Sequence, residues 1–347
     1  MNSTMLPRYD RAQSYAWNYE HAPAPVAVEV PAIPGEWSYC GRPVGSPLGL
    51  PAGPLLNGRW CLYYASLGFD VLTYKTVRSY ERPCYPLPNL QPVRCEQLAG
   101  GEERLPAINH DAPSWAVSFG MPSMSPETWR SDVAWTRKQL GPGKVLAVSV
   151  VGSVQPDWTL DRLAEDYAQC AAWAVEAGAD VIETNFSCPN VATCDGQLYQ
   201  QPADAARVAA RLRAAIGRTP LVVKIGHVHH EHEAEVLLEA LAPSIDGLAM
   251  TNSVAATIAA SDGQLMFEGQ KRGICGEATR TASLRQTALF ARLRERQGLK
   301  LSLVGVGGAS TARHVRHYLD AGAESVHLAT AAMLNPGVAL EIRREWK

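Results

Sequence analysis

The sequence predicts an α/β protein that folds as a TIM (β/α)8 barrel, with an extended Pro-rich N-terminal arm and long loops on the C-terminal face. Three observations predict this fold. Eight short apolar runs alternate with helical stretches, a glycine turn recurs between a helix and the next strand, and 347 residues suffice for one such barrel. Four or five strands would favour an open sheet, whereas eight favour a closed barrel.

The predicted domain organisation is an arm over residues 1–36 followed by the barrel over residues 37–347. Residues 21–37, HAPAPVAVEVPAIPGEW, are Pro-rich and have no apolar face of helical period, which indicates extended chain. We expect the arm to lie over the barrel or to reach a partner subunit. For four aromatic residues of the arm, packing is favoured over a stacking platform: Tyr9, Tyr15, Trp17 and Tyr19.

The predicted strands are short runs rich in β-branched and apolar residues. They lie near Leu48–Ala52, Val71–Lys75, Val145–Val151, Val181–Asn185, Leu221–Ile225, Gly247–Thr251, Leu301–Gly305 and Ser325–Ala329. Three times a helical stretch ends in a glycine turn that leads into a strand, within residues 66–74, 176–184 and 320–328. Glycine just beyond a helix permits the left-handed conformation that closes it, so the repeat supports parallel α/β architecture.

Two long, irregular loops interrupt this alternation. Residues 77–125 separate the second strand from a helix predicted at Pro126–Leu140, and residues 252–280 follow the sixth strand. Both leave the C-terminal ends of strands, where barrels of this kind place their sites. We therefore expect both loops to contribute to function.

The composition excludes several classes of protein. The chain has 32 Lys and Arg against 34 Asp and Glu, so no basic excess indicates nucleic acid or an anionic membrane. No apolar run approaches the ~20 residues of a membrane span, and the N-terminus lacks the pattern of a signal peptide. A cytoplasmic protein that acts on a small molecule is therefore expected.

The cysteines and histidines do not predict a metal site. None of the eight cysteines forms a CxxC pair, so reduced thiols are favoured over disulfides, zinc or an iron–sulfur cluster. They are Cys40, Cys61, Cys84, Cys95, Cys170, Cys188, Cys194 and Cys275. Residues 227–232, HVHHEH, could converge on a cation, but the start of a polar helix is favoured because no matching carboxylate–histidine motif accompanies them.

The densest functional signal is Asn185-Phe186-Ser187-Cys188-Pro189-Asn190, directly after the fourth strand. Two carboxamides flank a thiol on a Pro-stiffened turn. Carboxamides both donate and accept hydrogen bonds, which suits a planar ligand with N–H and C=O groups, and the thiol could be a nucleophile or proton acceptor. The alternative is a turn around an inert, buried cysteine.

Two lysines end apolar strands, Lys75 in FDVLTYK and Lys224 in PLVVK. A lysine at this position points toward the barrel mouth, where its charge requires an anion or a polar ligand. A lysine that snorkels to the surface would explain one of them more readily than both.

A phosphate site is predicted after the seventh and eighth strands. Gly305 to Ser310, GVGGAS, precedes a helix at about 311–320, and His327 to Thr330 follows the eighth strand. Backbone N–H groups and a helix N-terminus there can hold a phosphate, and these two loops often do so in such barrels. The alternative is two tight turns between strand and helix.

Together these motifs resemble the dihydroorotate dehydrogenase family of FMN flavoproteins, from about residue 38 to the end. The landmarks occur in family order: Ala52-Gly53, Tyr74-Lys75-Thr76, Ser118 to Pro122, Asn185 to Asn190, Lys224, Thr251-Asn252-Ser253, Gly273 to Gly276, Gly305 to Gly308, and Ala329-Thr330. The Asn-x-Ser-Cys-Pro-Asn element is specific, whereas the glycine turns are not. A cysteine at residue 188 resembles the soluble class, since the quinone-linked membrane class has serine there.

The resemblance implies an FMN-dependent oxidoreductase acting on a CH–CH bond of dihydroorotate or a related cyclic amide. Hydride would pass to flavin N5 and a proton to Cys188, with Lys75 as the second catalytic residue and Lys224 at the pyrimidine edge of the flavin. The residues implied to hold FMN are Ala52, Gly53, Lys75, Thr76, Ser149, Asn185, Lys224, Ser253, Gly276, Gly307, Gly308, Ala329 and Thr330. Those implied to contact the substrate are Lys75, Gly120, Met121, Asn185, Asn190, Asn252 and Ser253.

The chain departs from the family pattern in three places. Val117 stands where the family usually has an asparagine that helps to bind the orotate ring and carboxylate. Residues 191–197 lack the usual glycine and basic pattern, and the Pro-rich arm is not the helical pair of quinone-linked members. These departures motivate the hypothesis of a divergent homologue with a related substrate, such as another cyclic amide or a specialised metabolite.

Two readings compete with a flavin enzyme: a flavin-free, phosphate-binding barrel with lyase or isomerase activity, and a flavin-binding subunit that has lost catalysis. The second electron acceptor stays open between fumarate, oxygen and a nicotinamide cofactor reached through a separate electron-transfer partner. No GxGxxG motif follows a strand, which disfavours direct nicotinamide binding. The resemblance also implies a homodimer.

Overall fold

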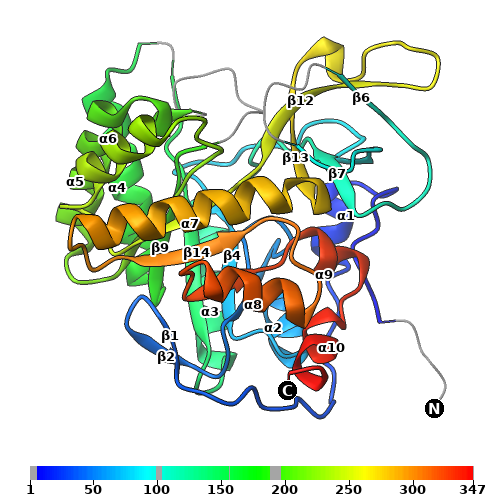
Figure 1. Cartoon of the computed structure of the whole chain (residues 1–347), viewed down its shortest axis with the longest axis horizontal. Helices are drawn as coiled ribbons and strands as arrows, with labels where there is room; N and C mark the ends of the chain where they lie inside the picture. The colour runs from blue at the N-terminus through cyan, green and yellow to red at the C-terminus, as the bar shows by residue number, and fades with distance from the viewer. Residues whose placement is uncertain (1–5, 99–103, 156, 188–196, 347) are drawn as a thin grey trace.

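The chain folds as a closed barrel of eight parallel strands, as predicted. A computed structural model describes residues 6–98, 104–155, 157–187 and 197–346 (Figure 1). The barrel strands are β3 (Leu48–Leu50), β4 (Val71–Val77), β8 (Val145–Val150), β9 (Val181–Asn185), β10 (Leu221–Lys224), β11 (Gly247–Met250), β14 (Ser302–Val306) and β15 (Ser325–His327). They pair in this order, and β15 pairs with β3 to close the barrel. Each coincides with a predicted strand to within three residues at either end.

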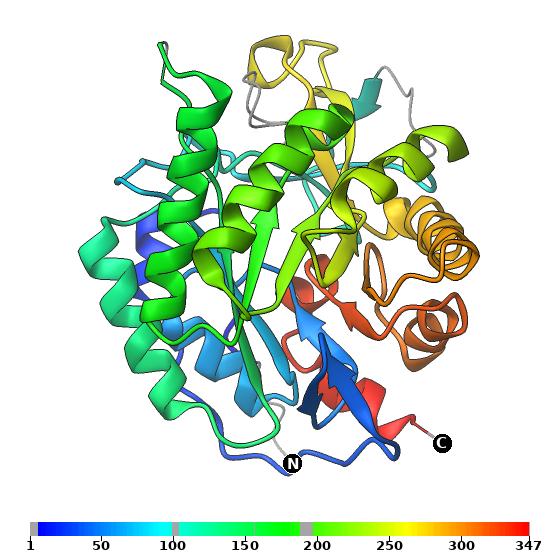
Figure 2. The same cartoon turned by 90° about the vertical axis from the view of Figure 1, so that its left-hand side faces the viewer.

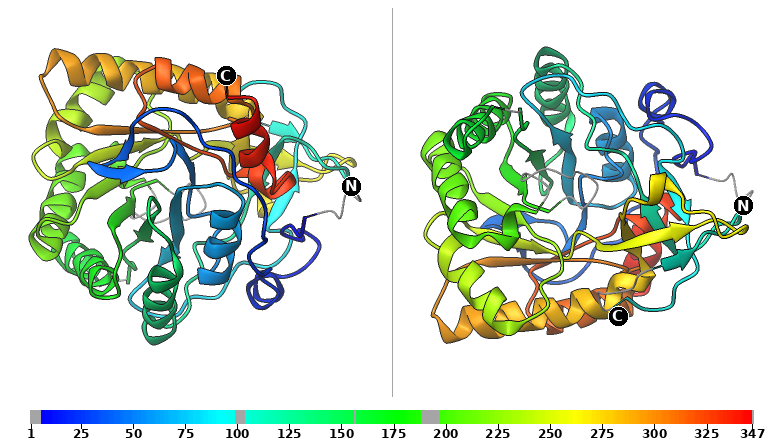
Figure 3. Two further views of the ribbon diagram at one scale, coloured as in Figure 1. Left: turned by 90° about the horizontal axis from the view of Figure 1, so that it is seen from below. Right: turned by 90° about the horizontal axis from the view of Figure 1, so that it is seen from above.

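Helices surround the strands (Figures 2 and 3). They are α2 (Gly58–Ser66), α3 (Pro126–Gln139), α4 (Leu160–Glu176), α5 (Pro202–Ile216), α6 (Glu231–Leu241), α7 (Arg280–Arg296) and α8 (Ala312–Asp320), followed by α9 (Thr330–Leu334) and α10 (Val338–Arg344). The turns after α2, α4 and α8 contain Gly68, Gly178 and Gly322 at φ of 95°, 99° and 98°. The recurring glycine turn therefore takes the left-handed conformation that the sequence predicts.

The barrel interior is apolar near its amino-terminal end. A hairpin of β1 (Trp37–Tyr39) and β2 (Arg42–Val44) lies at that end, and the Tyr39 side chain is fully buried against the inward-facing strand residues. These are mostly valines and include Val71, Val145 and Val222. Such β-branched side chains fill the interior as a packed core rather than a pore.

The two long loops are not irregular, so that part of the prediction is wrong. They contain β5 (Leu90–Pro92), β6 (Arg104–Pro106), β7 (Ser114–Val117), β12 (Val254–Ala259) and β13 (Arg272–Gly276), which form one five-stranded sheet in the order β5-β7-β13-β12-β6. Figure 1 shows this sheet at the end of the molecule opposite the hairpin. The pairing joins segments about 150 residues apart in the chain. Pro and Gly interrupt these segments, so their short strands have no clear sequence signal and form only through pairing with distant strands.

The described part of the arm packs along the barrel. A short helix, α1 (Tyr15–Glu20), precedes extended chain, and the Trp60 indole of α2 donates to the Asn18 carbonyl oxygen at 2.9 Å. Tyr9 and Tyr15 are buried, each with its ring centroid 6.0 Å from that of Phe119, so these two aromatics pack as predicted, whereas Trp17 is exposed. Among the described residues, no helix is long and apolar enough to cross a membrane.

Candidate active site

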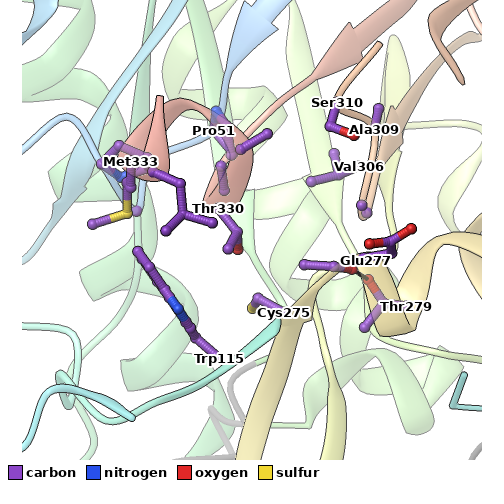
Figure 4. A pocket seen from close by; sticks show the side chains of 18 of the residues that line it. Pro51, Trp115, Cys275, Glu277, Thr279, Val306, Ala309, Ser310, Thr330 and Met333 are labelled. Atoms are coloured by element: carbon purple, nitrogen blue, oxygen red, sulfur yellow. Dashed lines mark hydrogen bonds between the residues drawn. The ribbon is translucent and has the colours of Figure 1, made fainter. Parts of the chain in front are cut away.

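A cavity of about 320 Å³ opens at the carboxyl ends of the barrel strands, which lies within the ~300–1,000 Å³ of typical ligand pockets (Figure 4). The barrel and α9 supply Gly53, Lys224, Thr251, Asn252, Val306, Gly307, Gly308, Ala329 and Thr330 to its lining, and the five-stranded sheet supplies Leu90, Trp115, Val117, Cys275 and Gly276. Both predicted loops therefore contribute to the site.

Three glycines form a cradle on one side of the cavity. Gly276, Gly307 and Gly308 have φ of 98°, 145° and 65°, a conformation that residues with a side chain rarely adopt. A Cβ atom on Gly308 would lie 2.7 Å from the Gly276 carbonyl oxygen and 2.9 Å from the Cα atom of Glu277. Only glycine fits, and α8 begins four residues later at Ala312, so the backbone here suits a phosphate.

The Gly53 backbone, just beyond β3, also faces the cavity. A Cβ atom there would have no neighbour within 4 Å, because it would project into open space. This gives a flat ligand direct access to the backbone. Ala52, predicted beside it, is buried and does not line the cavity.

Lys224 joins the cavity to the buried barrel interior. Its ammonium nitrogen is 3.0 Å from Glu183 Oε1, and the two side chains are 5% and 1% exposed. Because Lys224 also lines the cavity, its charge is shared between a buried carboxylate and any ligand above it. This matches the predicted position of Lys224, and the carboxylate partner was not predicted.

Lys75, Thr76 and Ser149 lie on neighbouring strands but do not line the cavity. The Thr76 and Ser149 hydroxyls hydrogen-bond to each other at 3.0 Å, and both are buried. The Lys75 ammonium lies 5.8 Å from the centroid of the Phe119 ring, which itself lines the cavity. Of these three predicted residues, Lys75 therefore contacts a residue of the lining, whereas Thr76 and Ser149 are buried and bonded to each other.

Two asparagines hold the residue that precedes Cys188. The Ser187 N–H donates to Asn185 Oδ1 at 3.0 Å, and the Asn252 amide donates to the Ser187 carbonyl oxygen. The Asn185 amide also contacts Met121 Sδ at 3.6 Å, which brings the predicted substrate residues of three different strand ends together. Cys188 and Asn190 lie outside the described residues, so their positions stay predictions.

The turn that contains Gly120 and Met121 takes positive φ at both residues, 73° and 51°. A Cβ atom on Gly120 would lie 2.6 Å from the Tyr85 ring, so this position requires glycine for its space as well as its φ. The turn is thereby fixed beside Asn185. Ser253, predicted to contact both ligands, is half-buried and does not line the cavity.

The sequence profile of the dihydroorotate dehydrogenase family matches residues 37–347. The chain belongs to the dihydroorotate dehydrogenase family. The profile begins at Trp37, the first residue of β1. The family consists of oxidoreductases, so the resemblance and the fold predicted from the sequence are confirmed.

Similar proteins come from several branches of the dihydroorotate dehydrogenase family. A dihydroorotate dehydrogenase of Dictyostelium discoideum is 29% identical over 87% of this chain and 86% of its own length. A quinone-type enzyme of Bordetella avium is 26% identical over 84% of this chain and 78% of its own length. The NAD(+)-type catalytic subunit of Staphylococcus carnosus is 28% identical over 57% of this chain and 60% of its own length. The crystal structure of the Eimeria tenella enzyme in complex with ferulenol has a TM-score of 0.73 and 16% sequence identity. The match covers 95% of this chain and 88% of that chain, which shows a shared fold.

Sequence reasoning missed the apolar side of the cavity in this family member. Figure 4 shows Trp115 and Met333 on one side, and Glu277, Thr279, Ala309 and Ser310 on the other. The apolar side comes from the five-stranded sheet and from the segment from α9 to α10, including Leu334 and Val338. Nothing in the local sequence distinguishes these residues from ordinary core residues.

His327, which begins the predicted HLAT phosphate motif, points into the barrel instead. It is 1% exposed, neither ring nitrogen has a hydrogen-bond partner among the described residues, and its ring lies 5.6 Å from that of Tyr39. Burial, together with the nearby Lys224 charge, lowers the pKa of His327 to about 3. The imidazole is therefore neutral at physiological pH.

Proposed function

We propose that this protein is an FMN-dependent oxidoreductase that acts on the CH–CH bond of dihydroorotate or a closely related cyclic amide. One observation carries the proposal: the Gly276, Gly307 and Gly308 cradle and the Lys224 ammonium line a single cavity at the carboxyl end of the barrel. A phosphate suits the cradle, and the polar edge of a planar ring suits the ammonium. Family membership supports the same cofactor and reaction.

The residues present fit FMN at this site. The glycine cradle, with Ala329 and Thr330 beside it, would hold the phosphate, and Gly53 would let the ring approach the backbone. Lys224 would face the pyrimidine edge. Bound there, FMN supplies a hydride acceptor, and the buried strand ends around it exclude water from that face.

The substrate would lie among Lys75, Asn185, Asn252 and the turn at Gly120 and Met121. Cys188 would take the proton from one substrate carbon while hydride leaves the neighbouring carbon. The hydrogen bonds of Asn185 and Asn252 fix both the N–H and the carbonyl of Ser187, so the residue before the proposed base is held in one orientation. Such positioning of a general base contributes ~10²–10⁴-fold to a rate.

Val117 favours a second candidate substrate. The apolar Val117 side chain lines the cavity at the position where the family usually has an asparagine. A ring that lacks the carboxylate of dihydroorotate would lose little binding free energy at this apolar contact. Orotate would leave a polar group less well paired there, which costs ~1–3 kcal/mol. A related cyclic amide without that carboxylate, such as dihydrouracil, is therefore the alternative.

An absorbance spectrum of the purified protein tests the cofactor, and anaerobic addition of each candidate tests the substrate. We expect flavin bands that bleach on addition of dihydroorotate. Bleaching by dihydrouracil alone would support the second candidate. If no flavin bands appear even after FMN is added, the flavin proposal is wrong and the flavin-free, phosphate-binding barrel is favoured.

The same reduced protein identifies the second electron acceptor. Fumarate, oxygen, a quinone or NAD(+) would be added to the bleached enzyme, and the acceptor that restores the flavin bands fastest is the candidate. Restoration by NAD(+) only after a cell extract is added would indicate a separate electron-transfer partner. A sedimentation experiment would test the predicted homodimer.

A further inference from the structure

A group of polar side chains lies inside the barrel, directly below the candidate active site. Tyr39, Glu183, Lys224 and His327 come from β1, β9, β10 and β15, and each is buried. Of these four, only Lys224 reaches the cavity. The proposed reaction uses Lys224 and assigns no task to the other three.

Contacts and charges connect these side chains. Glu183 Oε1 lies 3.0 Å from the Lys224 ammonium, and the Lys224 charge lowers the pKa of His327 in addition to the larger effect of burial. The ring centroids of Tyr39 and His327 are 5.6 Å apart. A Cβ atom on Gly49 would lie 2.3 Å from the His327 ring, so a glycine on the adjacent strand β3 leaves the space that the imidazole occupies. The neighbouring backbone therefore accommodates these side chains specifically.

Glu183 brings a formal negative charge into the barrel interior. Its second oxygen, Oε2, is buried and has no hydrogen-bond partner among the described residues. A carboxylate in this position requires a counter-charge, and Lys224 supplies it. The field that Lys224 projects into the cavity is therefore partly cancelled from below.

This cancellation matters for a cofactor that gains negative charge when it is reduced. An unopposed ammonium at the pyrimidine edge would stabilise reduced FMN strongly and raise its reduction potential. An ammonium already paired to a buried carboxylate stabilises it less. Neutral His327 occupies the space below without adding a charge.

We propose that Glu183 is a positioning residue that pairs with Lys224 and thereby lowers the reduction potential of the bound flavin. The inference rests on the proposed function, because it requires FMN above Lys224. It makes Glu183 the residue that sets the driving force for hydride transfer, although Glu183 itself touches neither cofactor nor substrate.

The test is the ratio of the dissociation constants of oxidised and reduced FMN, measured by a redox titration of the holoenzyme. For Glu183→Gln we expect this ratio to rise about tenfold, which is about 30 mV in the midpoint potential of a two-electron couple. The matched control is His327→Gln, which replaces one neutral side chain by another in the same group and should change the ratio less than twofold. An unchanged or lower potential in Glu183→Gln would overturn the inference.

A second comparison separates an effect through Lys224 from a general effect of charge. In a Lys224→Gln background, Glu183→Gln should no longer raise the potential, because a buried carboxylate that has lost its counter-charge takes up a proton and has no charge left to remove. The same rise in both backgrounds would show that Glu183 acts directly on the flavin, and the positioning role would be wrong.

A measurement on the unmodified holoenzyme avoids any loss of folding in the variants. With glutamate carboxylates labelled with ¹³C, the reduced-minus-oxidised infrared difference spectrum should show a shifted glutamate carboxylate band, because reduction draws the ammonium toward the ring. A spectrum without such a band would overturn the inference. Failure of the parent protein to bind FMN would instead overturn the proposed function on which it rests.

Discussion

The barrel and the five-stranded sheet line the same cavity in different ways. The barrel contributes mainly backbone: Gly53, Gly307 and Gly308 face the cavity at positions where a side chain would obstruct a ligand or clash. The sheet contributes side chains, such as Trp115 and Val117 on β7. The barrel side thus presents most of a cradle for a cofactor, which Gly276 at the end of β13 completes, whereas the sheet side chains present the surface against which a substrate is selected.

This difference shows where a family member can diverge. A backbone cradle tolerates little change, because each glycine is required by φ or by space. A side chain on the sheet can be exchanged without moving a strand. The departure at Val117 falls on the sheet side, as this division leads one to expect.

The largest expected effect belongs to the proposed base, Cys188. Cys188 follows β9, and replacing it with alanine removes the proposed base. In Cys188→Ala we expect flavin reduction to be at least ~100-fold slower, because general base catalysis is lost. Anaerobic stopped-flow absorbance measures the rate, and the flavin content of the variant is the control. Reduction at the parent rate would rule out Cys188 as the base.

The barrel side is tested at Gly308. A Cβ atom there would meet backbone atoms of Gly276 and Glu277, which cannot move without opening the cradle. We expect Gly308→Ala to weaken FMN binding by ~10- to 100-fold, the equivalent of a few kcal/mol of steric strain. Fluorescence quenching on FMN titration measures this. The control is Gly141→Ala, whose Cβ would have no neighbour within 4 Å. Equal losses in both variants would show that the cradle does not hold the phosphate.

The same contrast explains what the sequence could predict. The eight strands and the turn with Gly307 and Gly308 could be predicted because their signals are local: apolar runs, and glycines between a strand and a helix. Gly276 was expected only from the resemblance to the family. The five-stranded sheet was not, because β7 is completed by β13, about 150 residues away in the chain. Glu183 left one local signal, an acidic residue inside the apolar run VIETN, but its lysine partner 41 residues later could not be paired without the barrel.

Burial of His327 inside the barrel should make the free energy of unfolding depend on pH. The folded chain holds His327 with a pKa of about 3, whereas an unfolded histidine has a pKa of ~6.5. Between these values the unfolded state binds the proton and the folded state does not. Stability is therefore fully present above pH ~6.5 and is lost as the pH falls toward 3, by up to ~1.4 kcal/mol per pH unit.

In His327→Gln this contribution is absent. We expect the parent to lose about 1 kcal/mol more than the variant between pH 7 and pH 5.5, which urea unfolding at the two pH values measures. Parallel losses would mean that His327 is not held neutral inside the barrel.

The smallest effect, and the one that bears most directly on substrate choice, is expected on the sheet side at Val117. Val117→Asn restores the residue that the family usually has, at a position where the side chain lines the cavity. If dihydroorotate is the substrate, a new hydrogen bond worth ~1 kcal/mol should lower its KM several-fold, while FMN binding stays unchanged because the substitution leaves the three cradle glycines in place. Val117→Leu, which changes volume without polarity, is the control and should give no gain. The contrary outcome is that Val117→Asn slows flavin reduction by a substrate that lacks the carboxylate and leaves the reaction with dihydroorotate unchanged. That result would identify Val117 as the residue by which this family member selects a different ring.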